Sequence, residues 1–205
     1  MQEGWPAAEW TPRELLERCG DREVPVEVSS GGGDYRDAYD DAKCQPGRTF
    51  DASVPVPLSL LLDVMQSTHE QEPDQAGNQV QLYLAQRDVA EVLPELAANI
   101  PEAPPFPGLA ERLHQRSVWG SKTIRLYSPE QTQSLYPFAN PFLRNTSQVD
   151  VLSPDLDRHP MFASVPYLEC TLRPGDMLYI PRKWWHSVWA RTASLSISYW
   201  WTAVC

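Results

Sequence analysis

Apolar and polar residues alternate along the chain with two different periods, and each period predicts one kind of secondary structure. Thr11, Pro12 and Glu14 stand at the cap, first-turn and capping-box positions of a helix that ends at Gly20. The helical pattern predicts helices over residues 11–19, 57–66 and 88–98. Alternation and β-forming residues predict strands over residues 24–28, 80–84, 122–127, 167–172, 177–180 and 194–201.

The middle of the chain breaks this regularity. Residues 101–107 hold four prolines in seven positions, which predicts an extended linker that cannot lie inside a sheet. Residues 109–115 have a locally helical pattern. Polar loops are predicted over residues 29–46 and 67–78, and a long loop with short helical pieces over residues 129–166.

The segment Leu172–Trp201 carries the most chemical information. Arg173–Asp176 (RPGD) predicts a tight turn in which glycine takes a positive φ. His186 then follows two tryptophans in a β-forming stretch. A neutral imidazole in such a wall is suited to binding a transition metal. The alternative is a core histidine that a backbone carbonyl satisfies.

Together with Val118–Pro129 (VWGSKTIRLYSP), this segment resembles the JmjC branch of the cupin superfamily, Fe(II)/2-oxoglutarate oxygenases with a double-stranded β-helix. The resemblance is strongest to the small JmjC group that includes the bifunctional lysine demethylase/arginyl hydroxylase. It implies one domain over residues 1–205, with a strand–helix portion (1–107) and a truncated barrel portion (108–205). The predicted strands are too few for an eight-stranded barrel, and a central strand is missing near residues 108–118.

The metal triad of the family, His-x-Asp/Glu plus a distant His, is incomplete in this sequence. His186 matches the distant histidine, but residues 108–117 contain no His-x-Asp or His-x-Glu, and Arg116 stands where a carboxylate is required. His114 is either a surviving first ligand or a polar residue on a short surface helix. The resemblance therefore implies Fe(II) and 2-oxoglutarate as cofactors, makes their binding here doubtful, and assigns no catalytic residue.

The resemblance also implies a binding site for 2-oxoglutarate. Lys122 would form an ion pair with the distal carboxylate of that molecule; the alternative is a solvated lysine on an edge strand. Tyr83 would donate its hydroxyl to the same carboxylate, or else be a plain wall aromatic. Val188 and Trp200 match positions that line the pocket, although as hydrophobic residues they would be core in any case.

Charge and cysteine usage restrict the partners. A net charge of −10 argues against attraction to nucleic acid and suits a protein or basic-peptide partner. The four scattered cysteines predict neither structural zinc nor a disulfide framework. No signal peptide or membrane-length apolar run is recognised, so an intracellular protein, nuclear or cytoplasmic, is expected. His69 and His159 lie in polar loops and are expected to be solvated.

Three functional hypotheses remain open at this point. The first is an oxygenase that hydroxylates protein side chains or demethylates lysine, impaired here because the His-x-Asp/Glu motif is absent. The second is a catalytically inactive cupin-like binding or scaffold protein. The third explains the gap by exon skipping or an imperfect gene product, since the sequence changes abruptly from LHQ to RSVWGSK.

Overall fold

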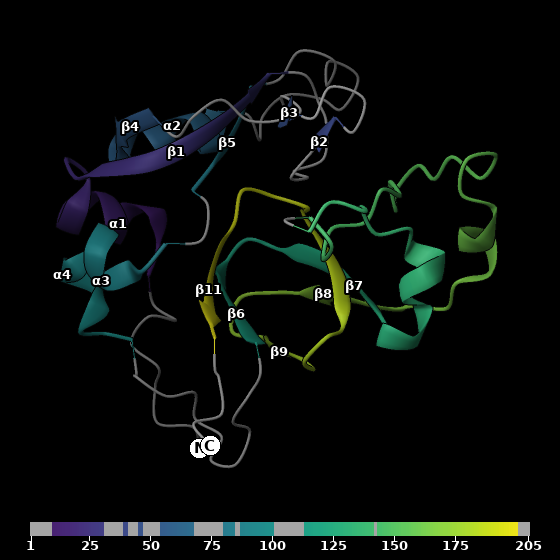
Figure 1. Ribbon diagram of the computed structural model, residues 1–205. Helices are drawn as coiled ribbons and strands as arrows, with labels where there is room; N and C mark the ends of the chain where they lie inside the picture. Colours follow the sequence, from purple (N-terminus) through teal and green to yellow (C-terminus); the bar gives the residue numbers. More distant parts are fainter. Residues whose placement is uncertain are drawn as a thin grey trace, which may run out of the picture.

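A computed structural model describes residues 10–30, 39–40, 45–46, 54–67, 80–84, 87–100, 113–141 and 143–200. Two three-stranded antiparallel sheets from the second half of the chain pack on each other, and the N-terminal portion covers one of them (Figure 1). The architecture is mainly β with a few flanking helices, as the sequence predicts.

The N-terminal portion is a small sheet with helices beside it. Its sheet has the order β4-β1-β5, formed by Val54–Pro57, Glu23–Ser30 and Val80–Tyr83. Helix α1 (Pro12–Cys19) begins at the predicted capping box, in which Thr11 and Glu14 cap each other. Helix α2 (Leu58–Ser67) follows β4 directly. A two-residue pair, β2 (Tyr39–Asp40) and β3 (Gln45–Pro46), lies within the predicted loop at 29–46.

The predicted helix over residues 88–98 is wrong as a single element. The structure has two short helices instead, α3 (Val89–Val92) and α4 (Pro94–Ala97). Pro94 has no N–H to donate and forces the preceding residue out of the helical region. Leu93 accordingly has φ −134° and ψ 63°, and the helix ends there before a new one begins.

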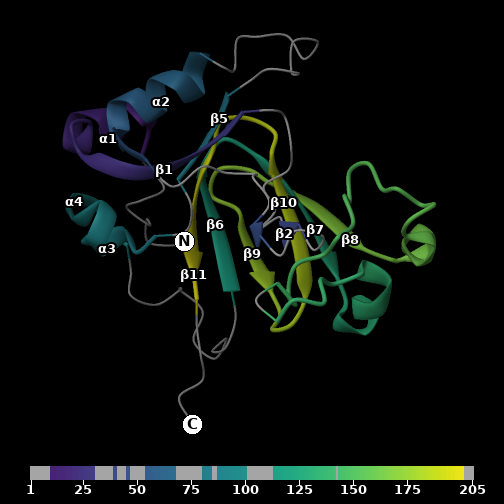
Figure 2. The same cartoon turned by 45° about the horizontal axis from the view of Figure 1, so that its top comes forward.

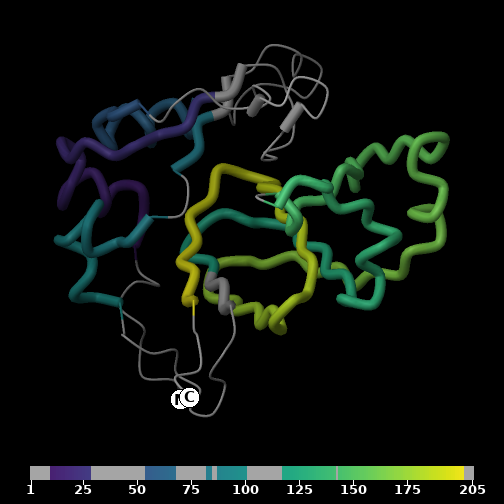
Figure 3. Tube along the Cα trace, in the orientation of Figure 1, coloured from purple at the N-terminus to yellow at the C-terminus, as the bar shows by residue number. Residues whose placement is uncertain are grey.

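The second half forms the two facing sheets. One has the order β10-β7-β8 and the other β11-β6-β9. Two 3₁₀ helices, η4 (Pro129–Leu135) and η5 (Pro160–Ser164), lie in the predicted loop between β7 and β8. Figure 3 shows this excursion on the side of the sheets opposite the N-terminal helices. The strands are β6 (Leu113–Trp119), β7 (Lys122–Tyr127), β8 (Leu168–Leu172), β9 (Met177–Ile180), β10 (Trp185–Ala190) and β11 (Leu195–Tyr199).

Strand β6 corrects two predictions from the sequence. The helical pattern over residues 109–115 is wrong for Leu113–Gln115, and the gap expected near residues 108–118 contains a strand from Leu113 onward. The physical reason is tertiary pairing, because β6 is the central strand between β9 and β11 and both neighbours supply ladder partners. Residues 101–112, with the predicted proline-rich linker, lie outside the described residues.

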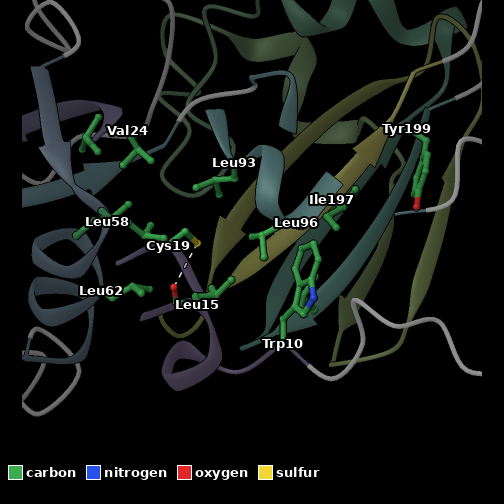
Figure 4. Packing of buried hydrophobic residues seen from close by; sticks show 13 residues of the cluster. Trp10, Leu15, Cys19, Val24, Leu58, Leu62, Leu93, Leu96, Ile197 and Tyr199 are labelled. Atoms are coloured by element: carbon green, nitrogen blue, oxygen red, sulfur yellow. Dashed lines mark hydrogen bonds between the residues drawn. The ribbon is translucent and has the colours of Figure 1, made fainter. Parts of the chain in front are cut away.

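Two apolar cores fix the two faces of the β11-β6-β9 sheet. On one face, Ile197 and Tyr199 pack with Trp10, Leu15 and Leu96 of the N-terminal portion (Figure 4). On the other face, Ile180 packs with Ile124, Leu126 and Leu172 of the β10-β7-β8 sheet. The sides of the two sheets that face each other are called the inner face below. Figure 2 shows the strands that border it.

Candidate functional site

Lys122 and His186 lie on the same face of the β10-β7-β8 sheet. In the antiparallel β7–β10 pair, His186 is opposite Leu126 and Ala190 is opposite Lys122. Directly opposed residues project to the same side of a sheet, and alternate residues along each strand share that side. Leu126 belongs to the core between the two sheets. Lys122 and His186 therefore both belong to the inner face.

The inner face separates these two groups by a distance suited to a small elongated ligand. Lys122 lies four residues from the Leu126 position that pairs with His186. At about 3.4 Å per residue along a strand, the two backbone positions are roughly 14 Å apart. A flexible lysine side chain shortens this span from one end. A molecule with two polar ends fits such an arrangement better than a single small ion does.

Lys122 is a half-buried cation without a carboxylate partner among the described residues. Burial lowers the pKa of its amine from the ordinary value of 10.5 to about 8. The cation Arg125, on the opposite face of the same strand, does have a carboxylate partner, because its Nε donates to Glu169 at 2.6 Å. A half-buried ammonium is costly unless an anion meets it. Lys122 is therefore an anion-binding candidate.

We expect the half-buried, unpaired amine of Lys122 to lower the free energy of unfolding, by an amount that depends on pH. Because the folded pKa of about 8 is below the unfolded value of 10.5, the unfolded chain binds more protons between these pH values. The free energy of unfolding then rises with pH through this window. We expect Lys122→Met to be more stable than the parent by about 2 kcal/mol at pH 7, with the difference shrinking from pH 8 upward. Urea unfolding at pH 7 and pH 9.5 measures this, and a difference independent of pH would contradict it.

His186 combines an exposed imidazole with a lowered pKa. Desolvation by the surrounding protein lowers the pKa, and a hydrogen bond with the Trp184 backbone partly opposes that effect. The residue is exposed, so it lies at the rim of the inner face and is not enclosed in the core. The alternative of a core histidine does not hold, because the residue is exposed, and the role of His186 as a metal ligand stays a prediction. A neutral, reachable imidazole is the form that binds a metal or accepts a hydrogen bond.

The described residues do not provide a complete metal site. Among them, no group of three His, Cys, Asp or Glu side chains lies close enough to hold an ion. On β6, His114 occupies the register position opposite Tyr179 and Tyr199, and Arg116 the position opposite Met177 and Ile197. The role of His114 as a ligand stays a prediction. An Fe(II) ion held by His186 alone does not fit, because the ion needs further ligands.

The remaining predicted pocket residues lie in three different places. Tyr83 is on β5, opposite Glu27 of β1, and burial followed by the charge of Glu27 raises the pKa of its phenol. Val188 lies on the inner face beside His186 and is 38 % exposed, and Trp200 directly after β11 is 61 % exposed. Neither Val188 nor Trp200 is the plain core residue that the sequence allowed as an alternative. Both are free to contact a ligand.

A row of serines on the facing sheet was not singled out from the sequence. Ser117 and Ser196 are directly opposed across β6 and β11, and Ser117 is 0 % exposed. The Oγ of Ser196 is buried without a hydrogen-bond partner. Because Ile197 and Tyr199 pack on the N-terminal core, Ser196 belongs to the inner face. The alternation of serine with apolar residues over 194–198 (SLSIS) was the available signal.

His159 corrects another expectation. It was predicted to be solvated, but it is 6 % exposed and its ring lies edge-on to Tyr136 at 4.8 Å. Packing of η5 against η4 buries the loop that the polar composition suggested would be open. His69 lies outside the described residues. Helices long and apolar enough to cross a membrane are absent from the described part of the chain.

Comparisons with known proteins match the second half of the chain to one protein family and nearly the whole chain to one relative. Residues 115–205 match the cupin-like domain family. Lysine-specific demethylase 8 of Xenopus tropicalis is 40 % identical over 146 residues, covering 58 % of this chain and 33 % of the frog protein. Jumonji C domain-containing protein 5 of Drosophila melanogaster is 31 % identical over 226 residues, covering 96 % of this chain and 52 % of the fly protein.

Lysine-specific demethylase 8 of Danio rerio is 47 % identical over 102 residues, covering 46 % of this chain and 25 % of that protein. The chain thus spans between about a quarter and about half the length of these relatives. The alignment with the fly protein is longer than the chain itself, so part of that protein has no counterpart here. The resemblance inferred from the sequence is confirmed: residues 115–205 match a cupin-like domain, and the similar proteins are named as a Jumonji C domain-containing protein and as lysine-specific demethylases.

Proposed function

We propose that this chain is an impaired Fe(II)/2-oxoglutarate oxygenase that keeps the anion-binding end of the site and lacks a complete metal-binding end. The single observation that supports this most strongly is the position of Lys122. Its ammonium is half-buried on the inner face, shares that face with His186, and has no carboxylate partner among the described residues. A dicarboxylate of the size of 2-oxoglutarate would supply the missing anion.

The residues of the inner face perform binding and positioning. Lys122 holds a carboxylate at one end, and Val188, between Lys122 and His186 along the sheet, covers the middle of the ligand. His186 offers a neutral nitrogen at the other end. Ser196 presents a buried hydroxyl from the facing sheet. Because the described residues do not fit Fe(II), no oxidation step follows from them.

The substrates of the relatives suggest the inherited reaction. Two of the relatives are named lysine-specific demethylases, so the ancestral activity proposed for this chain is hydroxylation or demethylation of protein side chains. A protein or peptide would then approach the open rim of the inner face near His186. The net charge of −10 favours a basic protein as the inherited substrate, whereas the exposed cations Arg182 and Lys183 act locally on a segment that lies along β10.

We expect the purified chain to form no succinate above background when supplied with Fe(II), 2-oxoglutarate and a peptide pool. The reason is that one described histidine cannot hold the metal in a reactive geometry. A coupled succinate assay measures this, with His186→Ala as the reference for background. Succinate formation that depends on Fe(II) and disappears in His186→Ala would mean that a non-standard ligand completes the site.

The same fold also supports a second function, that of an inactive cupin-like binding protein. The specific observation is β6, which pairs on both sides and is flanked by two packed cores although the triad motif is missing next to it. Transcript sequences across residues 108–119 distinguish a shortened oxygenase from a dedicated binding protein. A dominant longer product with His-x-Asp or His-x-Glu would make this chain a shortened form of a working oxygenase, and the short product alone would make it a dedicated binding protein.

A further inference from the structure

Strand β10 has one unpaired edge in the part of the chain that the structure describes. The sheet order is β10-β7-β8, so β7 covers one side of Trp185–Ala190 and no described strand covers the other. All six residues of β10 pair with β7 without a register shift. The backbone groups on the other side are therefore in regular extended geometry, which is the geometry that accepts another strand.

This edge lacks the devices that usually protect an edge strand. Natural edges are blocked by proline, by lysine within the strand, or by a bulge. The sequence of β10, WHSVWA, contains none of these residues, and its pairing with β7 is regular. The inner-face residues of the strand, His186, Val188 and Ala190, are all exposed. Among the described residues no strand pairs with this edge, and the side chains next to it are exposed.

Exposed cations precede and follow strand β10 in the sequence. Arg182 and Lys183 precede β10, Arg191 follows it, and all three are exposed. The Nε of Arg191 donates to Thr123 of β7, on the paired side of β10, so Arg182 and Lys183 are the cations that remain for the open edge. They belong to a half of the chain with the opposite charge balance to the first half. Residues 113–205 carry nine Lys/Arg and six Asp/Glu, whereas residues 1–112 carry eight and 21. Because charges beyond about 8 Å are screened at physiological salt, these local cations outweigh the net charge of −10 for a ligand on β10.

We propose that the free edge of β10 binds an extended acidic peptide of a partner protein by strand addition. Main-chain hydrogen bonds to β10 provide affinity, and Arg182 and Lys183 select acidic sequences. Alternate side chains of the added strand lie about 5 Å from those of His186 and Val188. This proposal goes beyond the proposed function, because strand addition requires neither 2-oxoglutarate nor a metal.

The backbone test uses a labelled ten-residue peptide in which glutamate alternates with threonine or valine. Two isomers are compared, each N-methylated on the alternate amides of one edge, so that charge and composition are identical. A strand pairs through one edge, so we expect one isomer to bind the full chain at least tenfold more weakly than the other by fluorescence anisotropy. Equal affinity of the two isomers would show an unstructured charge contact and overturn the proposal.

The charge test uses a matched pair of double variants. Arg182→Glu with Lys183→Glu is expected to weaken binding of the acidic peptide at least tenfold. Arg144→Glu with Arg158→Glu makes the same charge change at exposed positions in the excursion between β7 and β8, and is expected to weaken it less than threefold. Tighter binding of the lysine counterpart of the peptide would overturn the proposal. If the parent chain self-associates and the Arg182→Glu/Lys183→Glu variant does not, the edge binds a second copy of the chain. That result would also overturn the proposal.

Discussion

Gly120→Ala is expected to destabilise the chain by about 4 kcal/mol, which is most of the free energy of unfolding of a domain at the low end of the usual range. Gly120 lies in the turn between β6 and β7 with φ +71°, a region that alanine adopts only at a cost. An added Cβ would also lie 2.1 Å from the carbonyl oxygen of Ala193 and 2.6 Å from the Cβ of Ser194. Both neighbours belong to the turn between β10 and β11, so neither can move without shifting a strand.

The matched control is Gly175→Ala in the turn before β9. Gly175 also has a positive φ, +88°, but its added Cβ would meet nothing within 4 Å. We expect this variant to lose only about 1 kcal/mol, the backbone contribution alone. Urea unfolding of both variants separates the steric term from the backbone term. Equal destabilisation would mean that the turn at Gly120 is not held against Ala193 and Ser194.

The sequence predicts an element well where its local signal and its tertiary environment agree. Strands β7 and β9 have the bounds that alternation predicts, and α1 begins at its capping box. The helix over residues 88–98 failed for a local reason, because Pro94 interrupts an otherwise good apolar pattern. The helical pattern before Gln115 failed for a non-local one, since β6 gains ladder partners on both sides that the local pattern does not reveal.

The candidate site could be predicted only in part, for a related reason. The motif identified Lys122 and His186 as candidates, but their shared face follows from the β7–β10 register, which a sequence does not state. The exposure of Val188 and Trp200 depends on which strands cover the rim. Ser196 became a candidate only when Ile197 and Tyr199 were seen to pack on the other face.

Lys122→Ala is expected to weaken binding of 2-oxoglutarate by more than tenfold, because the ligand loses the cation that neutralises its distal carboxylate. Isothermal titration calorimetry at pH 7 measures the Kd. Lys183→Ala removes the same side chain from an exposed turn beside β10 and is expected to leave the Kd unchanged within about twofold. An unchanged Kd in Lys122→Ala would remove Lys122 from the site, and absence of binding to the parent would refute the proposed function.

The pH dependence of binding and a comparison of 2-oxoglutarate with glutarate test the same role of Lys122 further. The pKa of the Lys122 amine is about 8 in the free protein, so binding should weaken as the pH rises above 8 and the ammonium is lost. Bound carboxylate favours the protonated amine, which shifts the loss to somewhat higher pH. Without a metal to chelate, the 2-oxo group adds little, and glutarate is expected to bind within about threefold of 2-oxoglutarate. A tenfold preference for 2-oxoglutarate that requires Fe(II) would show that the chain completes a metal site after all.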